Sequence, residues 1–128
     1  MDVRVLVVDD TEHVRKMLAE MLELDGFDVV GQAGSGHEAI DLVPVVEPDV
    51  IVMDYKMPGL DGLEAARSIR ADRPNQAIVL YTAYLDSDLE AQAKEAGVAM
   101  CVGKIEGLNQ LERHITELCR DLGRTSSP

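Results

Sequence analysis

The stretch VRVLVVDDTEHVRKMLAEMLELDG (residues 3–26) decides the fold class of this sequence. Residues 3–8 are apolar apart from Arg4, as in a strand covered on both faces, and two aspartates follow them. Residues 11–25 then carry apolar side chains at helical spacing, and Gly26 is a typical helix end. A buried strand followed by an amphipathic helix is typical of parallel α/β proteins.

The same alternation repeats along the chain. Further strands are predicted over residues 27–33, 50–53, 77–81 and 100–102, and further helices over residues 36–46, 62–70, 87–96 and 108–122. Asp10 or Thr11 is expected to cap the first helix, and Ser87 with Glu90 to form a capping box for the fourth. Pro44 should kink or shorten the second helix. Strands joined by helical crossovers form a parallel sheet with helices on both faces.

The composition restricts the class of partner. The 128 residues are 46% hydrophobic, enough for one packed domain, although only 3% are aromatic and none is Trp. Acidic residues outnumber basic ones by 24 to 12, for a formal charge of −12. Such a surface repels the phosphates of DNA, RNA and anionic lipids. We therefore expect no direct binding of nucleic acid or membrane by this domain.

Nothing in the sequence indicates export or a zinc centre. The N-terminal apolar run is too short for a signal peptide and no window reaches membrane-spanning length, so the cytoplasm is the expected location. The positions of Cys101 and Cys119 relative to the three histidines match no zinc site. Reduced thiols are the expectation for that compartment.

Acidic residues follow the first and third predicted strands. Asp9 and Asp10 come after residues 3–8, and Asp54 comes after residues 50–53. In a parallel sheet the carboxyl ends of the strands meet at one edge, where working sites lie. Carboxylates crowded there repel one another by about 4 kcal/mol at a separation of about 4 Å in a surface-like dielectric. A hard divalent cation relieves this repulsion, so the pattern predicts a site for Mg²⁺, with Mn²⁺ as an alternative.

A hydroxyl and a cation follow the last two strands. Thr82 comes directly after the fourth strand, and Lys104 comes just after the fifth. Beside a bound cation, Lys104 could neutralise one phosphoryl oxygen and Thr82 could donate a hydrogen bond to another. Asp54, on a central strand, is the best placed carboxylate to act as a nucleophile and form an aspartyl phosphate. Taken singly, each residue also has an ordinary structural explanation, such as helix capping for Asp10.

Four segments together resemble the response-regulator receiver family. They are VLVVDD (5–10), DVIVMDYKMPGLDGLEAARSIR (49–70), IVLYTAY (78–84) and CVGK (101–104). The resemblance covers almost the whole chain, and it rests on the paired acids, the Asp-x-x-Met-Pro-Gly loop, the Thr and the Lys in that order. It implies a flavodoxin-like (βα)5 three-layer sandwich whose parallel strands lie in the order 2-1-3-4-5.

The resemblance also implies a role for each motif residue. Asp54 would be the phospho-acceptor, and Thr82 and Lys104 would bind the phosphoryl oxygens. Members of the family receive the phosphoryl group from a histidine kinase, hydrolyse it slowly and act as switches rather than as enzymes. Mg²⁺ would be held by Asp9, Asp10, Asp54 and the backbone carbonyl of Lys56.

Three positions depart from the family pattern. Cys101 stands where Tyr or Phe is usual, and a thiol cannot make the rotation that follows movement of the Thr, so Tyr81 or Tyr84 is expected to take part of that role. Ile105 stands where many members have a cis-proline, and a trans bond is expected. Lys56 and Tyr84 flank the route of the attacking water, so we expect slow self-dephosphorylation.

Other function classes fit less well. The run GSGHEA (34–39) matches a dinucleotide-binding pattern with Asp54 twenty residues after its first glycine, but it follows the second strand and not the switch point between strands one and three. A flavodoxin-type carrier would need a Ser, Thr and Gly-rich loop after the first strand. A haloacid-dehalogenase-type phosphatase would need an acid where Lys56 stands. A receiver-like interaction module that never takes phosphate stays open because of Cys101.

The expected organisation is one receiver domain over residues 1–122, followed by a loose tail or linker start over residues 123–128. The partners implied are a sensor histidine kinase or phosphotransfer protein, and an output domain or target protein. A homodimer through the fourth helix, fifth strand and fifth helix is a further expectation.

Overall fold

The computed structural model describes residues 2–83 and 85–120. Within them, five strands alternate with five α-helices, as the sequence predicts, and a short 3₁₀ helix follows the last strand. The elements are β1 (Arg4–Val8), α1 (Glu12–Leu24), β2 (Asp28–Ala33), α2 (Gly36–Val46), β3 (Val50–Met53), α3 (Gly62–Asp72), β4 (Ala77–Thr82), α4 (Ser87–Glu95), β5 (Met100–Gly103), η1 (Lys104–Glu106) and α5 (Leu108–Cys119). The predicted end of the last helix lies outside the described residues.

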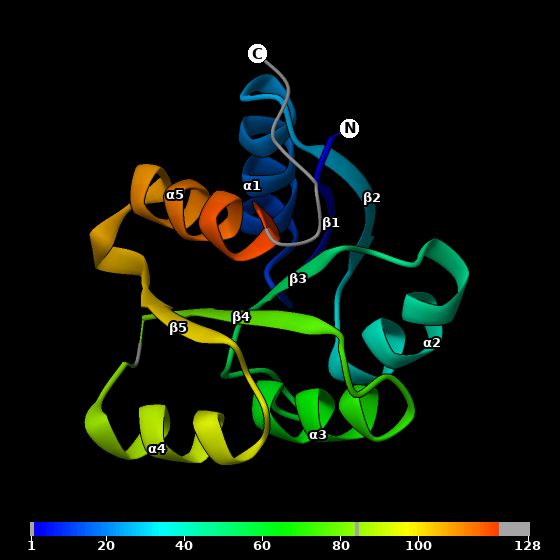
Figure 1. Ribbon diagram of the computed structural model, residues 1–128, viewed down its shortest axis with the longest axis vertical. Coiled ribbons are helices and arrows are strands. Elements are labelled where there is room, and N and C mark those ends of the chain that lie inside the picture. The colour runs from blue at the N-terminus through cyan, green and yellow to red at the C-terminus, as the bar shows by residue number, and fades with distance from the viewer. Residues whose placement is uncertain (1, 84, 121–128) are drawn as a thin grey trace.

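The five strands form one parallel sheet in the order β2-β1-β3-β4-β5. This order confirms the predicted flavodoxin-like topology. The chain reverses its direction of travel across the sheet between β1 and β3, which lie side by side (Figure 1). Loops that follow these two strands therefore border the crevice in which sheets of this kind bind their ligands.

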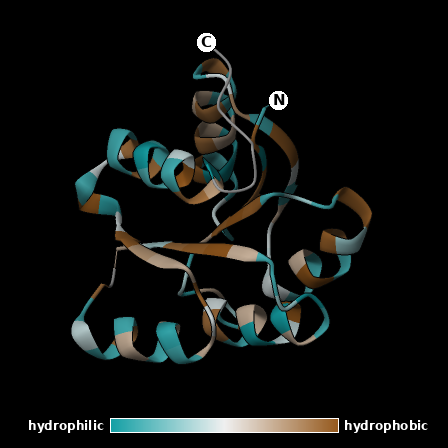
Figure 2. Ribbon diagram, in the orientation of Figure 1, coloured by the Kyte–Doolittle hydropathy of each residue, from teal (hydrophilic) through white to brown (hydrophobic). Residues whose placement is uncertain are grey.

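Helices cover both faces of the sheet. Figure 1 shows α1 and α5 on one side and α3 and α4 on the other, and α2 packs into the same apolar cluster as α3 and α4. The residues of β3 alternate between the two clusters: Ile51 and Met53 face α2, α3 and α4, whereas Val50 and Val52 face α1 and α5. All four are buried, and the central strands accordingly appear brown in Figure 2. A strand buried on both faces fixes its own register, and so fixes the residue that follows it.

The cap predicted for α4 was wrong, whereas Thr11, one of the two residues predicted to cap α1, occupies the N-cap position without the expected side-chain bond. The α4 helix is capped by Asp86, whose carboxylate accepts the Leu89 N–H at 2.8 Å, and not by Ser87. Asp86 has the extended backbone that a capping residue requires, whereas Ser87 is already helical. At the start of α1, neither Asp10 nor Thr11 accepts a helical N–H through its side chain within the described chain; instead the Thr11 N–H donates to the Asp9 carboxylate at 2.9 Å.

Pro44 does not shorten α2, which continues to Val46 as one helix. The side chain of Arg4, on β1, donates to the Val46 carbonyl at 2.6 Å and to the Glu47 carbonyl at 3.4 Å. Carbonyl groups at a helix end have no partner inside the helix, so these bonds stabilise the last turn that contains the proline.

Two acidic residues, Asp25 and Glu112, lie close together in the layer formed by α1 and α5. Asp25 follows α1 and Glu112 lies on α5, and both line an open cavity of about 300 Å³ together with Arg113, Glu117 and Arg120. The Glu112 Oε2 atom is buried and has no hydrogen-bond donor. Burial and the neighbouring Asp25 carboxylate raise the pKa of Glu112 to about 7, because loss of contact with water and a nearby negative charge both disfavour ionisation.

This pair predicts that the stability of the domain falls as the pH rises from about 4.5 towards about 7, because the folded state holds a proton that the unfolded state has lost. Glu112→Gln is expected to stabilise the domain at about pH 8 by about 1 kcal/mol more than at about pH 5, since partial exposure reduces the full effect. Urea unfolding at both pH values measures the difference. Glu117→Gln, on the same helix and cavity, is the control; an equal response of the two variants would contradict the prediction.

Candidate metal centre

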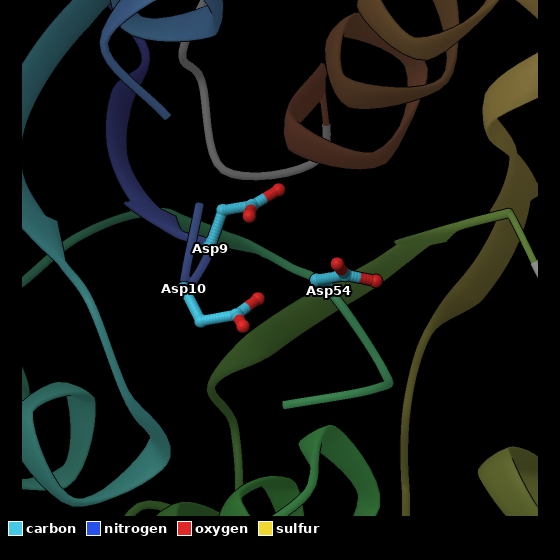
Figure 3. Close-up of side chains that lie close together, drawn as sticks. All are labelled: Asp9, Asp10 and Asp54. Carbon is cyan, nitrogen blue, oxygen red and sulfur yellow. The ribbon is translucent and has the colours of Figure 1, made fainter. Parts of the chain in front are cut away.

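Three carboxylates meet where β1 and β3 end. One oxygen each of Asp9, Asp10 and Asp54 lies within 4.8 Å of the others, the arrangement expected from the sequence. Figure 3 shows Asp9 and Asp10 projecting from the end of β1 toward the side on which Asp54 lies. Backbone hydrogen bonds hold their positions: the Asp54 N–H donates to the Val8 carbonyl at 3.0 Å, and the Asp9 N–H donates to the Ala33 carbonyl at 3.1 Å. These donors suit a hard divalent cation such as Mg²⁺.

Lys104 reaches this cluster from the end of β5. Its Nζ lies 3.2 Å from Asp9 Oδ2 and 3.4 Å from Asp54 Oδ2. The exposed fractions of the three side chains are 29% for Lys104, 4% for Asp9 and 12% for Asp54. Three carboxylates and one ammonium leave a formal charge of −2, so this partly buried site, in which Asp10 is exposed, has an excess of negative charge equal to the charge of one divalent ion.

The pKa shifts agree with this excess. Burial raises the pKa of Asp54, and the negative charge of Asp9 adds to the rise, against the opposing effect of Lys104. Burial alone would lower the pKa of Lys104, but Asp54 and Asp9 outweigh it and raise that pKa. One ammonium is therefore held firmly charged between two acids, while it does not fully compensate them.

The orientation of the Asp54 side chain is set by the loop that follows it. The Tyr55 N–H donates to Asp54 Oδ1 at 2.8 Å, while Oδ2 faces Lys104. The Gly62 N–H donates to the Tyr55 carbonyl at 2.7 Å and brings the start of α3 against the Asp54 backbone. A Cβ atom on Gly62 would lie 2.4 Å from the Asp54 carbonyl oxygen, so the position admits only glycine without a backbone shift.

Gly62→Ala is expected to destabilise the domain by about 1–3 kcal/mol, because the overpacked contact is with backbone and must move it. The same shift should weaken the binding of Mg²⁺ through displacement of Asp54. Chemical unfolding and calorimetric Mg²⁺ titration measure the two effects. Gly59→Ala is the control: Gly59 has a φ of 77° and no atom within 4 Å of an added Cβ, so it should lose stability while Mg²⁺ affinity stays constant. Unchanged Mg²⁺ affinity in Gly62→Ala would contradict the second expectation.

Thr82 and Lys56 belong to two further segments at this edge of the sheet, the end of β4 and the loop after β3. Thr82 ends β4, is fully buried, and is aligned with Gly103, the residue before Lys104. Lys56 is exposed in the loop after β3 and lines a cavity of about 290 Å³ with residues of the first turn of α4. Tyr84 lies outside the described residues, so the role expected of it stays a prediction.

Cys101 and Tyr81 lie on opposite faces of the sheet. Cys101, half-buried on β5, packs against the cluster that contains α4, and burial together with Glu90 raises the pKa of its thiol. Tyr81, on β4, packs against the cluster that contains α5, and the Lys104 ammonium lies 6.0 Å from the centre of its ring. Neither Cys101 nor Cys119 forms a disulfide. The peptide bond before Ile105 is trans, as expected.

Two residues at this site were not predicted from the sequence. Gly62 belongs to the quoted segment 49–70, but nothing in the sequence indicates which glycine meets Asp54. Arg15, on α1, donates to the Asp9 carbonyl at 2.9 Å. Its place about one turn into α1 was the available signal, because long helical side chains lean toward the N-terminal end of their helix and can reach the loop before it.

Comparison with known proteins decides the family. Residues 5–116 match the response regulator receiver domain profile. The chain belongs to this family. The receiver domain is 44% identical over 94 residues to the transcriptional regulatory protein PdtaR of Mycobacterium tuberculosis, covering 73% of this chain and 45% of that protein. It is 40% identical over 114 residues to the response regulator GacA of Pseudomonas viridiflava, covering 88% of this chain and 53% of that protein. The receiver domain thus spans about half the length of these relatives.

Solved structures agree. A LuxR-family two-component response regulator from Aurantimonas sp. SI85-9A1 superposes with a TM-score of 0.84 at 30% identity, over 99% of this chain and 90% of that one. A response regulator receiver domain from Clostridium thermocellum gives a TM-score of 0.86 at 26% identity, over 94% and 97%. The run at residues 34–39 follows β2, an edge strand of the receiver domain, which disfavours the dinucleotide-binding alternative. None of the described helices has the length and apolar character needed to span a bilayer.

Proposed function

We propose that the domain is a phosphorylation switch of a two-component system, in which Asp54 accepts a phosphoryl group in a reaction that depends on Mg²⁺, with Mn²⁺ as a substitute. The observation that carries the proposal is the excess charge of −2 at a partly buried site formed by Asp9, Asp10, Asp54 and Lys104. The donor is a phosphohistidine on a sensor kinase or phosphotransfer protein. An Asp54 oxygen forms the new bond to phosphorus as the bond between phosphorus and the imidazole nitrogen breaks.

Each residue of the site has a distinct task in this proposal. Mg²⁺ supplies charge neutralisation between the carboxylates and the phosphoryl group. Lys104 stabilises a phosphoryl oxygen by charge, and Thr82 donates a hydrogen bond to another. The ligands of Mg²⁺ are the carboxylates of Asp9, Asp10 and Asp54 with the backbone carbonyl of Lys56.

Phosphorylation then changes the contacts of the domain with its target. We propose that Tyr81 takes over part of the role that an aromatic residue at position 101 has in the family, because its ring lies beside the Lys104 ammonium. Cys101 is too small for that role. Lys56 and Tyr84 hinder the approach of water to the phosphoryl group, so the phosphorylated state decays slowly.

The domain is proposed to extend over residues 1–122 and to act in the cytoplasm. Its output is a domain beyond residue 128 or a separate target protein, and self-association through α4, β5 and α5 is one means of switching. The domain itself assists its own phosphorylation and slow dephosphorylation but converts no other substrate.

Incubation with acetyl phosphate and Mg²⁺, followed by intact-mass measurement, tests the proposal. The expected result is a gain of one phosphoryl group that requires the metal and is lost in the presence of EDTA. A protein that binds no Mg²⁺ and never gains a phosphoryl group would instead be the phosphate-independent interaction module.

A further inference from the structure

The backbone between Asp9 and Asp10, the two acidic residues that follow β1, is held by a side chain from α1. Arg15 Nη1 donates to the Asp9 carbonyl at 2.9 Å. The Thr11 N–H donates to the Asp9 carboxylate at 2.9 Å. Together these bonds fix the peptide that joins Asp9 to Asp10, and Asp10 is the exposed member of the carboxylate cluster. Within residues 2–83 and 85–120, no hydrogen bond or ion pair holds the Asp10 side chain, so its position depends on this peptide.

The neighbouring β2–α2 loop leaves room for the guanidinium. A Cβ atom on Gly34 would lie 3.1 Å from Arg15 Nη1, closer than side chains ordinarily approach. The Arg15 Nε atom is buried as well, which shows that the group is enclosed between two loops and is not an extended surface cation. Gly34, the first glycine of the run that resembles a dinucleotide-binding loop, thus leaves space for the Arg15 guanidinium.

We infer that Arg15 is a positioning residue for the metal centre, which holds the Asp9–Asp10 peptide so that the Asp10 carboxylate stays directed at the cation. This inference rests on the proposed function. Groups that orient a metal ligand without touching the metal typically change metal affinity by about 10–100-fold when removed.

The sign of the effect distinguishes positioning from simple electrostatics. Arg15 is a cation near a cation site, so its charge alone disfavours Mg²⁺, and removal of that charge alone would tighten binding. Loss of the bond to the Asp9 carbonyl would weaken binding. The two explanations therefore predict opposite changes for the same substitution.

Calorimetric Mg²⁺ titration of the wild-type chain, Arg15→Met, Arg15→Lys and Lys16→Met provides the test. Arg15→Met is expected to bind Mg²⁺ about tenfold more weakly. Arg15→Lys, which retains a donor for the carbonyl, should recover most of the affinity. Lys16→Met removes a cation from the next position, where the ammonium is exposed and paired with Glu12 at 2.8 Å, and should bind as tightly as the wild type or slightly more tightly.

Each outcome decides a separate point. Equal or tighter binding by Arg15→Met overturns the inference and leaves the proposed function intact. Equal loss in Arg15→Lys and Arg15→Met also overturns it, because charge and donor would then be irrelevant. Failure of the wild-type chain to bind Mg²⁺ overturns the proposed function itself. The NMR chemical shifts of the Asp10 and Thr11 amides, compared with those of the wild-type chain, show whether the loop after β1 has moved in a folded variant.

Discussion

Asp54→Asn is expected to abolish the gain of a phosphoryl group from acetyl phosphate and Mg²⁺. An amide is not a nucleophile under these conditions, and neither Asp9 nor Asp10 follows the central strand β3 as Asp54 does. The expected result on intact-mass measurement is the unmodified mass at a time when the wild-type chain is fully labelled.

This variant should remain folded. Burial raises the pKa of Asp54, so its ionised form destabilises the folded state, and the contribution is unfavourable above the raised pKa. Asparagine removes that charge and retains the shape, so the free energy of unfolding near neutral pH should stay constant or increase. Asp72→Asn, an exposed position on α3, is the matched control and should label normally. Persistent labelling of Asp54→Asn would place the acceptor elsewhere.

Lys104→Met is expected to destabilise the metal-free domain by about 2–3 kcal/mol. Removal of one partner from a buried ion pair leaves the other charge uncompensated, and the partial exposure of Lys104 reduces that effect. In the variant the three carboxylates carry a charge of −3 and not −2, so the attraction for Mg²⁺ increases. Saturating Mg²⁺ should therefore recover more stability in the variant than it adds to the wild type.

Chemical unfolding with and without Mg²⁺ measures this difference. Lys94→Met, an exposed position on α4, should change stability by less than about 0.5 kcal/mol in either condition. An equal loss for Lys104→Met with and without Mg²⁺ would mean that the lysine stabilises the fold by packing and not through the acidic cluster.

The sheet and the clustering of the aspartates were predictable from the sequence, because both follow from the periodicity of its apolar residues. Apolar strands and amphipathic helices alternate without a break, and carboxyl ends of parallel strands must share an edge. Asp9 and Asp54 had to lie near each other once β1 and β3 were neighbours, whatever the details of the loops.

The rest depended on backbone angles and on contacts distant in sequence. Asp86 and Ser87 are both good capping residues, and only the extended conformation of Asp86 selects it. The approach of Gly62 to the Asp54 carbonyl depends on the path of a loop with several plausible turns. Asp25 and Glu112 are far apart in the chain, and the raised pKa of Glu112 follows from how closely α5 packs on the end of α1.

The hydrogen bonds that tie the Asp9 and Asp54 amides to Ala33 and Val8 have a consequence for exchange with solvent. The Asp54 amide extends the ladder between β1 and β3 at the centre of the sheet, which opens only when the whole molecule does, whereas the Asp9 amide extends the ladder between β1 and the edge strand β2. Fraying of any one surface helix would leave the aspartate backbones in place. Deuterium should therefore enter the Asp54 amide as slowly as it enters the middle of β3, and the Asp9 amide sooner, although both carboxylates border water.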